Sequence, residues 1–331
     1  MNFTKYNGID NLSRKQTVDY IVAQGFSDGE WVVENKIHGA NFSIWYDGVD
    51  FKFAKRSGFI PDGENFYNHL SIADKLKGYA KGIFDQCDVE NVTIYGEIFG
   101  GSYPDLKSTT KAVQKGVFYT PDIAFIGFDI KINGEFVDAD TKYRLFTDLE
   151  IPFTPPLFRG KFRDVIEFDP VFPDPTYKMF GLDEVPDNFS EGVVLKPVVP
   201  AYFVTGSRVI LKNKNPAFGE KAHAKKGGVK GAPQLPEVSD EAKGLLQELH
   251  SYVTENRIRN VLSKIGEVTN KDFGKVIKDL NEDVMEDFMK DNEDVFTALT
   301  KDEQKILTKS MNKASSFLLR ENFLNIIDGQ F

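Results

Sequence analysis

Hydrophobic periodicity changes on either side of a segment rich in glycine, proline and lysine. From about residue 31 to 209, short runs rich in Val, Ile, Phe and Tyr are separated by Gly, Asp and Pro, a pattern typical of strands and turns. After residue 239, apolar residues such as Leu245, Leu246 and Leu249 recur at helical spacing. The sequence therefore predicts an α+β domain followed by an all-helical domain.

The chain length supports this division. At 331 residues the chain is longer than a typical single domain and suits one large and one small domain. The intervening segment HAKKGGVKGAPQLPEVSD has little to bury and is typical of a linker. We predict a first domain over 1–225, a linker over 226–238 and a helical domain over 239–331.

Composition indicates a soluble globular protein, because hydrophobic residues make up 41% and charged residues 27% of the chain. The N-terminus has no apolar signal region, and no apolar run approaches the ~18 residues of a membrane span. The single cysteine, Cys87, can form no internal disulfide, which fits a reducing compartment. We therefore expect a cytoplasmic protein without a membrane partner, and we interpret Cys87 as a structural residue.

Charge is distributed unevenly along the chain, whose net charge is -9. If it were spread evenly, this acidity would oppose binding to nucleic acid, whose affinity depends mainly on phosphate contacts. However, residues 205–231 contain seven basic residues and one acid, whereas 279–303 contain ten acids against Lys290 and Lys301. The acidity is therefore interpreted as a solvated helical face, and a basic strip remains available for phosphate.

Five short segments place chemically reactive side chains beside glycines or at strand ends. In chain order they are KIHGAN at 36–41, YGEIFG at 95–100, GFD at 127–129, EGVVLK at 191–196 and VILKNK at 209–214. Alternation along a strand puts Lys36 and His38 on one face, and it directs Glu191 and Leu195 away from the face of Lys196. Taken singly, each segment also fits a structural interpretation. A strand-end lysine is usually solvated, an isolated Phe is usually core, and a lone His is usually structural.

Together and in this order, the segments resemble motifs I, III, IIIa, IV and V of the covalent nucleotidyltransferases, the superfamily of ligases and mRNA capping enzymes. The form K-x-H-G-x-N, with His38 where DNA ligases and capping enzymes mostly carry aspartate, is similar to the RNA ligase 2 family, typified by the double-strand RNA ligase of bacteriophage T4. Further similarity appears at 54–58 and 251–276. The resemblance implies an adenylyltransferase domain of antiparallel sheets with flanking helices, followed by a small all-α domain.

The resemblance also implies an activity, that of an ATP-dependent RNA ligase acting in RNA repair. Such an enzyme transfers AMP from ATP to a lysine, then to an RNA 5′-phosphate, and a 3′-hydroxyl finally displaces AMP. The expected substrate is a nick in duplex RNA or an RNA/DNA hybrid, and the expected ion is Mg²⁺, with Mn²⁺ as an alternative. We expect a monomer, located in the host cytoplasm if a phage encodes it.

The resemblance assigns the nucleotide-binding residues by position. Lys36 is the nucleophile and must be deprotonated to attack, which the neighbouring cations Lys212 and Lys214 favour while they neutralise the α-phosphate. Glu97 matches a ribose-contacting glutamate and Phe128 an aromatic that stacks on adenine. The other predicted pocket residues are Asn35, where the T4 relative has glutamate, together with Ile37, Asn41 and Arg56.

The remaining assignments concern metal and RNA. Glu191 matches the carboxylate that organises a divalent ion, since Mg²⁺ prefers oxygen ligands. Arg56 would grip phosphate, and Lys196 would lie beside AMP or the 5′-phosphate. His38, Asn41 and Asp129 are predicted to act in the later steps, with His38 as either a proton shuttle or a phosphate donor. A basic face of the helical domain is predicted at Arg257, Arg259, Lys264 and Lys271.

Two other functions compete with this interpretation. A DNA ligase or capping enzyme would share the five motifs, but the helical tail counts against both, because those enzymes mostly carry an OB-fold there. A non-catalytic RNA-binding module would be expected to have lost Lys36, Glu191 or a lysine of the fifth segment, and all are present.

Overall fold

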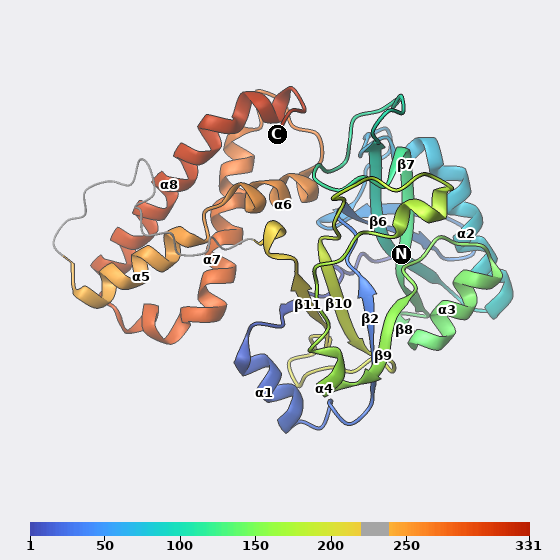
Figure 1. The fold of residues 1–331 in the computed structure, drawn as a ribbon, viewed down its shortest axis with the longest axis horizontal. Coiled ribbons are helices and arrows are strands. Elements are labelled where there is room, and N and C mark those ends of the chain that lie inside the picture. Colours follow the sequence, from blue (N-terminus) through green and yellow to red (C-terminus); the bar gives the residue numbers. More distant parts are fainter. Residues whose placement is uncertain (220–237) are drawn as a thin grey trace. The chain divides into compact units, whose positions relative to one another are not determined.

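The computed structural model describes residues 1–219 and 238–331, which form two compact units, Met1–Ala217 and Phe218–Phe331 (Figure 1). The first unit is built on two sheets. One has the strand order β1-β11-β10-β2-β9, and the other has the order β5-β4-β3-β6-β7-β8. All strand pairs are antiparallel except the short parallel pair of β1 and β11.

The five-stranded sheet consists of β1 (Asp10–Asn11), β2 (Glu30–Asn35), β9 (Pro156–Lys161), β10 (Gly192–Pro197) and β11 (Leu211–Lys214). The six-stranded sheet consists of β3 (Ala40–Tyr46), β4 (Phe51–Lys55), β5 (Gly58–Phe59), β6 (Val92–Ser102), β7 (Thr120–Ile132) and β8 (Glu135–Phe136). The helices of this unit are α1 (Lys15–Ala23), α2 (Ala73–Cys87), α3 (Ala139–Asp148) and α4 (Phe162–Val165), with 3-10 turns η1 (His69–Ile72), η2 (Thr176–Phe180) and η3 (Pro216–Phe218).

Helices cover the outer faces of both sheets (Figure 1). Leu76 and Ile83 of α2 and Phe146 of α3 pack with Phe42 and Ile44 of β3 in one core. Trp31, Val33 and Leu195 pack with α1 and α4 in another. Because side chains alternate along a strand, the neighbouring residues of these strands point to the opposite, inner faces.

The inner faces of the two sheets meet in a third core. Tyr6, Trp45, Tyr95 and Ile210 are buried there, with Phe128 partly buried against them. Strand alternation also puts charged residues on these inner faces, including Glu34, Glu97 and Lys196. The chemistry of the molecule is therefore concentrated between the two sheets.

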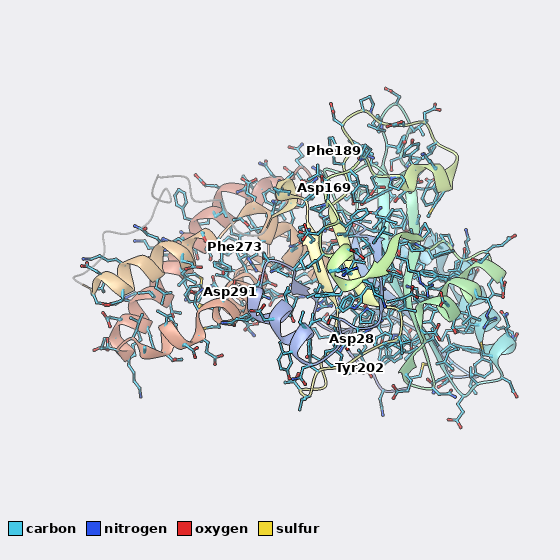
Figure 2. All side chains as sticks on the ribbon, turned by 60° about the horizontal axis from the view of Figure 1, so that its bottom comes forward. Asp28, Asp169, Phe189, Tyr202, Phe273 and Asp291 are labelled. Carbon is cyan, nitrogen blue, oxygen red and sulfur yellow. The ribbon has the colours of Figure 1, made fainter. Side chains whose placement is uncertain are left out.

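The second unit contains the helices α5 (Asp240–Ser251), α6 (Glu255–Ile265), α7 (Phe273–Ala298) and α8 (Lys301–Ile327). The hydroxyls of Ser239, Thr254 and Thr300 cap α5, α6 and α8 by accepting backbone N–H groups. Figure 2 labels Phe273 and Asp291 on α7. The Phe273 ring packs edge-on against Phe323 of α8, and Asp291 accepts a hydrogen bond of 2.5 Å from Tyr252.

The predicted α+β domain followed by an all-helical region is confirmed. Apart from Val238, the predicted linker 226–238 lies outside the described residues, as does the predicted boundary at 225. Among the helices that the structure describes, none is long and apolar enough to cross a membrane.

One surface prediction is wrong. Arg257, expected on a basic face, is 1% exposed and pairs with Asp283 and Asp287 of α7 at 2.6 and 3.0 Å. Two of the acids attributed to a solvated face therefore neutralise a buried guanidinium.

Candidate active site

Lys36 directly follows β2, at the start of the turn that leads into β3. Its backbone N–H donates to Gly192 O at 2.9 Å, which ties this turn to β10. Gly39 allows the turn to approach β6, because a Cβ there would lie 2.5 Å from Ile98 O. The N–H of His38 donates to Tyr119 Oη at 2.8 Å. These backbone contacts fix the position of the KIHGAN segment.

Glu191 is the centre of a cluster of charged side chains. Its Oε2 lies 2.8 Å from Lys36 Nζ and 3.4 Å from His38 Nδ1, and its Oε1 lies 2.8 Å from Lys214 Nζ. The carboxylate is 2% exposed. Burial alone would raise its pKa, but Lys214 and Lys36 hold the pKa of Glu191 well below its ordinary value. Glu191 is therefore a fixed anion between two lysines.

The backbone before β10 explains why Glu191 reaches Lys36. Simple alternation predicted that Glu191 shares a face with Leu195, yet Leu195 packs in the outer core with Trp31. Gly192 has φ of +138° and lies so close to β11 that a Cβ would be 2.2 Å from Asn213 O. Only glycine adopts this conformation readily, and it turns Glu191 toward Lys36 and Lys214.

Glu97 belongs to the same site but has a different electrostatic character. It lies on β6 directly opposite Asn41 of β3. Its Oε2 is buried and has no hydrogen-bond partner among the described residues. Burial raises the pKa of Glu97 to about 8, although Lys36 and Arg56 act in the opposite direction. We call Lys36, His38, Glu97, Glu191 and Lys214 the catalytic cluster.

A second group of charges lies buried between the sheets. Lys196 Nζ contacts Glu34 Oε2 at 2.7 Å and Asp129 Oδ1 at 3.1 Å. Lys142 Nζ contacts Glu34 Oε1 at 2.5 Å, and Arg208 contacts Asp129 Oδ2 at 2.7 Å. We call these five residues the intersheet ion cluster.

The intersheet ion cluster keeps its carboxylates ionised despite burial. Desolvation would raise the pKa of Asp129, but Arg208 and Lys196 hold it far below its ordinary value. Lys142 and Lys196 likewise lower the pKa of Glu34 against the effect of burial. Burial lowers the pKa of Lys142 to about 8, although Glu34 raises it. The charges therefore compensate one another inside the protein.

The intersheet ion cluster also holds the backbone of Phe128. Lys196 Nζ donates to Phe128 O at 2.8 Å, and Lys142 Nζ donates to the same oxygen at 3.2 Å. The Phe128 ring lies 5.1 Å from the ring of Tyr6. Phe128 is thus fixed from its carbonyl while its ring lines the intersheet core.

The structure brings some predicted site residues together and separates others. Lys36, His38, Glu97, Glu191 and Lys214 meet in the catalytic cluster. Asn41 lies opposite Glu97 on the neighbouring strand, and the charge of Arg56 acts on Glu97. Lys212 precedes Lys214 by two residues and so shares its strand face. Lys196, predicted beside AMP or the 5′-phosphate, and Asp129, predicted to act in the later steps, both lie in the intersheet ion cluster, and each is 2% exposed.

The residues flanking Lys36 have buried side chains. The Asn35 amide donates to Asp174 Oδ2 at 2.8 Å and to Thr176 Oγ1 at 3.3 Å, and it accepts from Ser190 Oγ. Ile37 is 4% exposed. The Asn35 side chain is thus engaged within the protein, and its predicted contact with adenine stays a prediction.

Sequence reasoning missed several residues of this region, Arg208 among them. Glu34 stands out only as an acid inside the otherwise apolar run WVVEN, which is a signal of a buried charge pair. Tyr119 and Lys142 had no local signal, because their partners His38 and Glu34 are 81 and 108 positions away.

Glu191 could bind a divalent ion together with substrate phosphates. Among the described residues no group of three or more His, Cys, Asp or Glu side chains could hold a metal ion. Mg²⁺ is commonly bound by one or two carboxylates together with waters and substrate phosphates, and Glu191 is a single ionised carboxylate. The residues therefore fit an ion shared with a bound triphosphate rather than an ion caged by protein.

Comparison with known proteins gives matches over both units. The family described as RNA ligase matches residues 29–214, and the family described as T4 RNA ligase 2 C-terminal matches residues 236–316.

Two curated relatives match nearly the whole of this chain. The chain is 28% identical over 390 residues to RNA-editing ligase 2, mitochondrial, of Trypanosoma brucei brucei, covering 99% of this chain and 93% of that protein. It is 26% identical over 400 residues to RNA-editing ligase 1, mitochondrial, of the same organism, covering 98% and 84%. A solved structure of the Naegleria gruberi RNA ligase with PPi is similar with a TM-score of 0.44 and 12% identity, over 65% of this chain and 57% of that one.

Proposed function

The chain belongs to the RNA ligase family, as an ATP-dependent RNA ligase of the T4 RNA ligase 2 type, and from that premise we propose that it seals 3′-hydroxyl/5′-phosphate nicks in duplex RNA or RNA/DNA hybrids. The observation that carries the proposal is the catalytic cluster, in which the buried anion Glu191 lies between Lys214 and Lys36, whose side chain is 18% exposed. This arrangement suits a lysine that forms a covalent bond with a nucleotide.

In the first step Lys36 Nζ attacks the α-phosphorus of ATP. A P–N bond forms, the bond to the bridging oxygen breaks, and pyrophosphate leaves. Lys212, Lys214 and Arg56 stabilise the negative charge that develops on the α-phosphate, and Glu191 orients the nucleophile through the 2.8 Å contact to Nζ. The product is a lysyl-AMP.

The nucleotide is bound between the two sheets. Glu97 Oε2, buried without a partner among the described residues, is available to a ribose hydroxyl, and Asn41 lies opposite it. Phe128 offers its ring to adenine, and Ile37 and Asn35 adjoin the nucleophile. Glu191 would hold Mg²⁺, or Mn²⁺ in its place, jointly with the phosphates of ATP, and this ion would neutralise charge on the leaving pyrophosphate.

In the later steps the RNA 5′-phosphate accepts AMP from Lys36, and the 3′-hydroxyl then attacks that phosphorus and releases AMP. His38 lies beside Glu191 and is assigned to these steps, as a phosphate donor or a proton carrier. Asp129 and Lys196 act indirectly, by holding Phe128 in place. Asp129 pairs with Lys196, and Lys196 donates to the Phe128 carbonyl. The trypanosomal relatives are named RNA-editing ligases, which supports RNA as the polynucleotide.

Labelling with ATP tests the proposed chemistry. Protein incubated with α-labelled ATP and Mg²⁺ and then denatured should retain label in wild type and in Lys81→Ala, but not in Lys36→Ala. Lys81 is the matched control, because its exposed side chain on α2 pairs with Asp85 and with no other acid in residues 1–219 and 238–331. The proposal would be contradicted if wild type and Lys81→Ala retained no label, or if Lys36→Ala retained it. Sealing of a nicked RNA duplex by wild type then tests the substrate.

A further inference from the structure

Helices α7 and α8 pack in one unit but have opposite charge. Helix α7 (Phe273–Ala298) contains eight acidic residues and three lysines. In α8 the stretch 304–320 contains Lys305, Lys309, Lys313 and Arg320 and no acid. A cationic segment of more than four turns is therefore presented by a protein of net charge -9.

The four cations lie on one face of α8. At 100° per residue they fall within about 80° of each other, on the side opposite the core residues Leu307, Met311 and Ala314. Lys305, Lys309, Lys313 and Arg320 are all exposed. We call this face, with Phe317, the α8 ridge.

The cations of the α8 ridge are largely uncommitted. Lys309, Lys313 and Arg320 form no salt bridge or side-chain hydrogen bond with any residue in 1–219 or 238–331, and Lys305 has only Asp302 at 3.7 Å. On α7, by contrast, Lys278 and Lys290 each pair with an acid one turn away. Unpaired cations in a row attract a polyanion.

An aromatic ring lies among these cations. Phe317 is 37% exposed, and with Asn312, Lys313, Ser316 and Arg320 it lines a hollow of about 380 Å³. A base inside a duplex already stacks on its neighbours, so an exposed ring stacks most readily on an unpaired base. Cations that follow a backbone, combined with an aromatic platform, are typical of single-strand binding.

We propose that the α8 ridge binds an unpaired segment of the RNA substrate, with phosphates on Lys309, Lys313 and Arg320 and a base stacked on Phe317. This inference rests on the proposed function, because it takes RNA as the substrate. It adds a second RNA site, located entirely within the helical unit and separate from the catalytic cluster.

Charge neutralisation tests the phosphate contacts. Anisotropy with a labelled oligouridylate of about 12 nucleotides should show that K309Q/K313Q/R320Q in the full chain binds at least ~10-fold more weakly at 0.1 M salt. The slope of log K against log salt should become less negative by about 2, since each single-strand phosphate contact contributes about 0.7. K243Q/K278Q/K290Q, which removes three lysine charges from α5 and α7, should bind as wild type.

Removing the ring tests the unpaired base. F317A should weaken oligouridylate binding ~10-fold, leave a blunt RNA duplex unaffected, and be rescued by F317W. The proposal would be overturned if F317A lost as much affinity for the duplex as for the single strand. It would also be overturned if K309Q/K313Q/R320Q bound oligouridylate as tightly as wild type, or if K243Q/K278Q/K290Q bound it as weakly as K309Q/K313Q/R320Q. Every variant should still form lysyl-AMP with α-labelled ATP, so failure of the ridge is distinguishable from failure of the catalytic proposal.

Discussion

The catalytic cluster and the intersheet ion cluster are built from the same kinds of residue but differ in how completely they are paired. In the intersheet ion cluster, Glu34 and Asp129 each contact two cations, and Lys142 and Lys196 are 2–3% exposed. In the catalytic cluster, Glu97 keeps an oxygen without a partner among the described residues, and Lys36 is 18% exposed. Arg208 Nε also has no partner among the described residues, but both carboxylates of the intersheet ion cluster are paired with cations. This set holds strands in place, whereas the open carboxylate of the catalytic cluster is ready for a ligand.

Replacing Glu191 should have the largest effect, on chemistry. Glu191→Gln removes the anion that orients Lys36, and we expect the rate of lysyl-AMP formation to fall ~10³-fold, the size typical of losing one preorganised electrostatic contact. Single-turnover labelling with α-labelled ATP measures this rate. A loss below tenfold would show that Lys36 is oriented by other residues.

Opening the intersheet ion cluster should instead affect stability. Lys142→Met leaves Glu34 with one cation fewer in a buried position, and the free energy of unfolding should fall by about 3–5 kcal/mol. Urea unfolding measures it. Lysyl-AMP formation below the unfolding transition should decrease less than tenfold. The double variant Glu34→Gln/Lys142→Met should recover part of the stability, and equal losses in single and double variants would contradict the pairing.

The buried, unpaired carboxyl of Glu97 predicts that the free energy of unfolding of the unliganded protein depends on pH. Because burial raises the pKa of Glu97 from 4.5 to about 8, the folded state retains a proton that the unfolded chain loses. The resulting stabilisation is complete below pH ~4.5 and is lost as the pH rises through about 8. Relative to Glu97→Gln, wild type should lose up to about 5 kcal/mol over this range. Parallel pH profiles in urea unfolding would show that folding does not raise the pKa of Glu97.

Local sequence patterns were sufficient for the architecture and for the motif residues of the catalytic cluster. A short run rich in Val predicted β2, and helical spacing predicted α5 and α6. Lys36, His38 and Glu191 were found from motifs whose glycines permit close backbone approach. The orientation of Glu191 was not predictable from alternation, because the φ of Gly192 interrupts it.

Buried ion pairs between distant residues could not be predicted. Lys142 lies on α3, whose polar sequence looks solvated, and its burial is apparent only when Glu34 of β2 is brought beside it. Arg257 likewise looked like a surface cation among acids, yet Asp283 and Asp287 neutralise it inside the helical unit. In both cases the charge balance is set by tertiary packing rather than by neighbours in the chain.

The smallest predicted effect comes from removing one tyrosine hydroxyl beside each cluster. Tyr119→Phe removes the hydroxyl that accepts the His38 N–H. Tyr143→Phe removes a hydroxyl that donates to Glu34, whose ion pairs with Lys142 and Lys196 remain. Each loss should lower stability by about 1 kcal/mol. Only Tyr119→Phe should also slow lysyl-AMP formation, by about fivefold, because it loosens the turn that carries Lys36. Equal rates in the two variants would mean that this turn is held by Gly192 and the β6 contact alone.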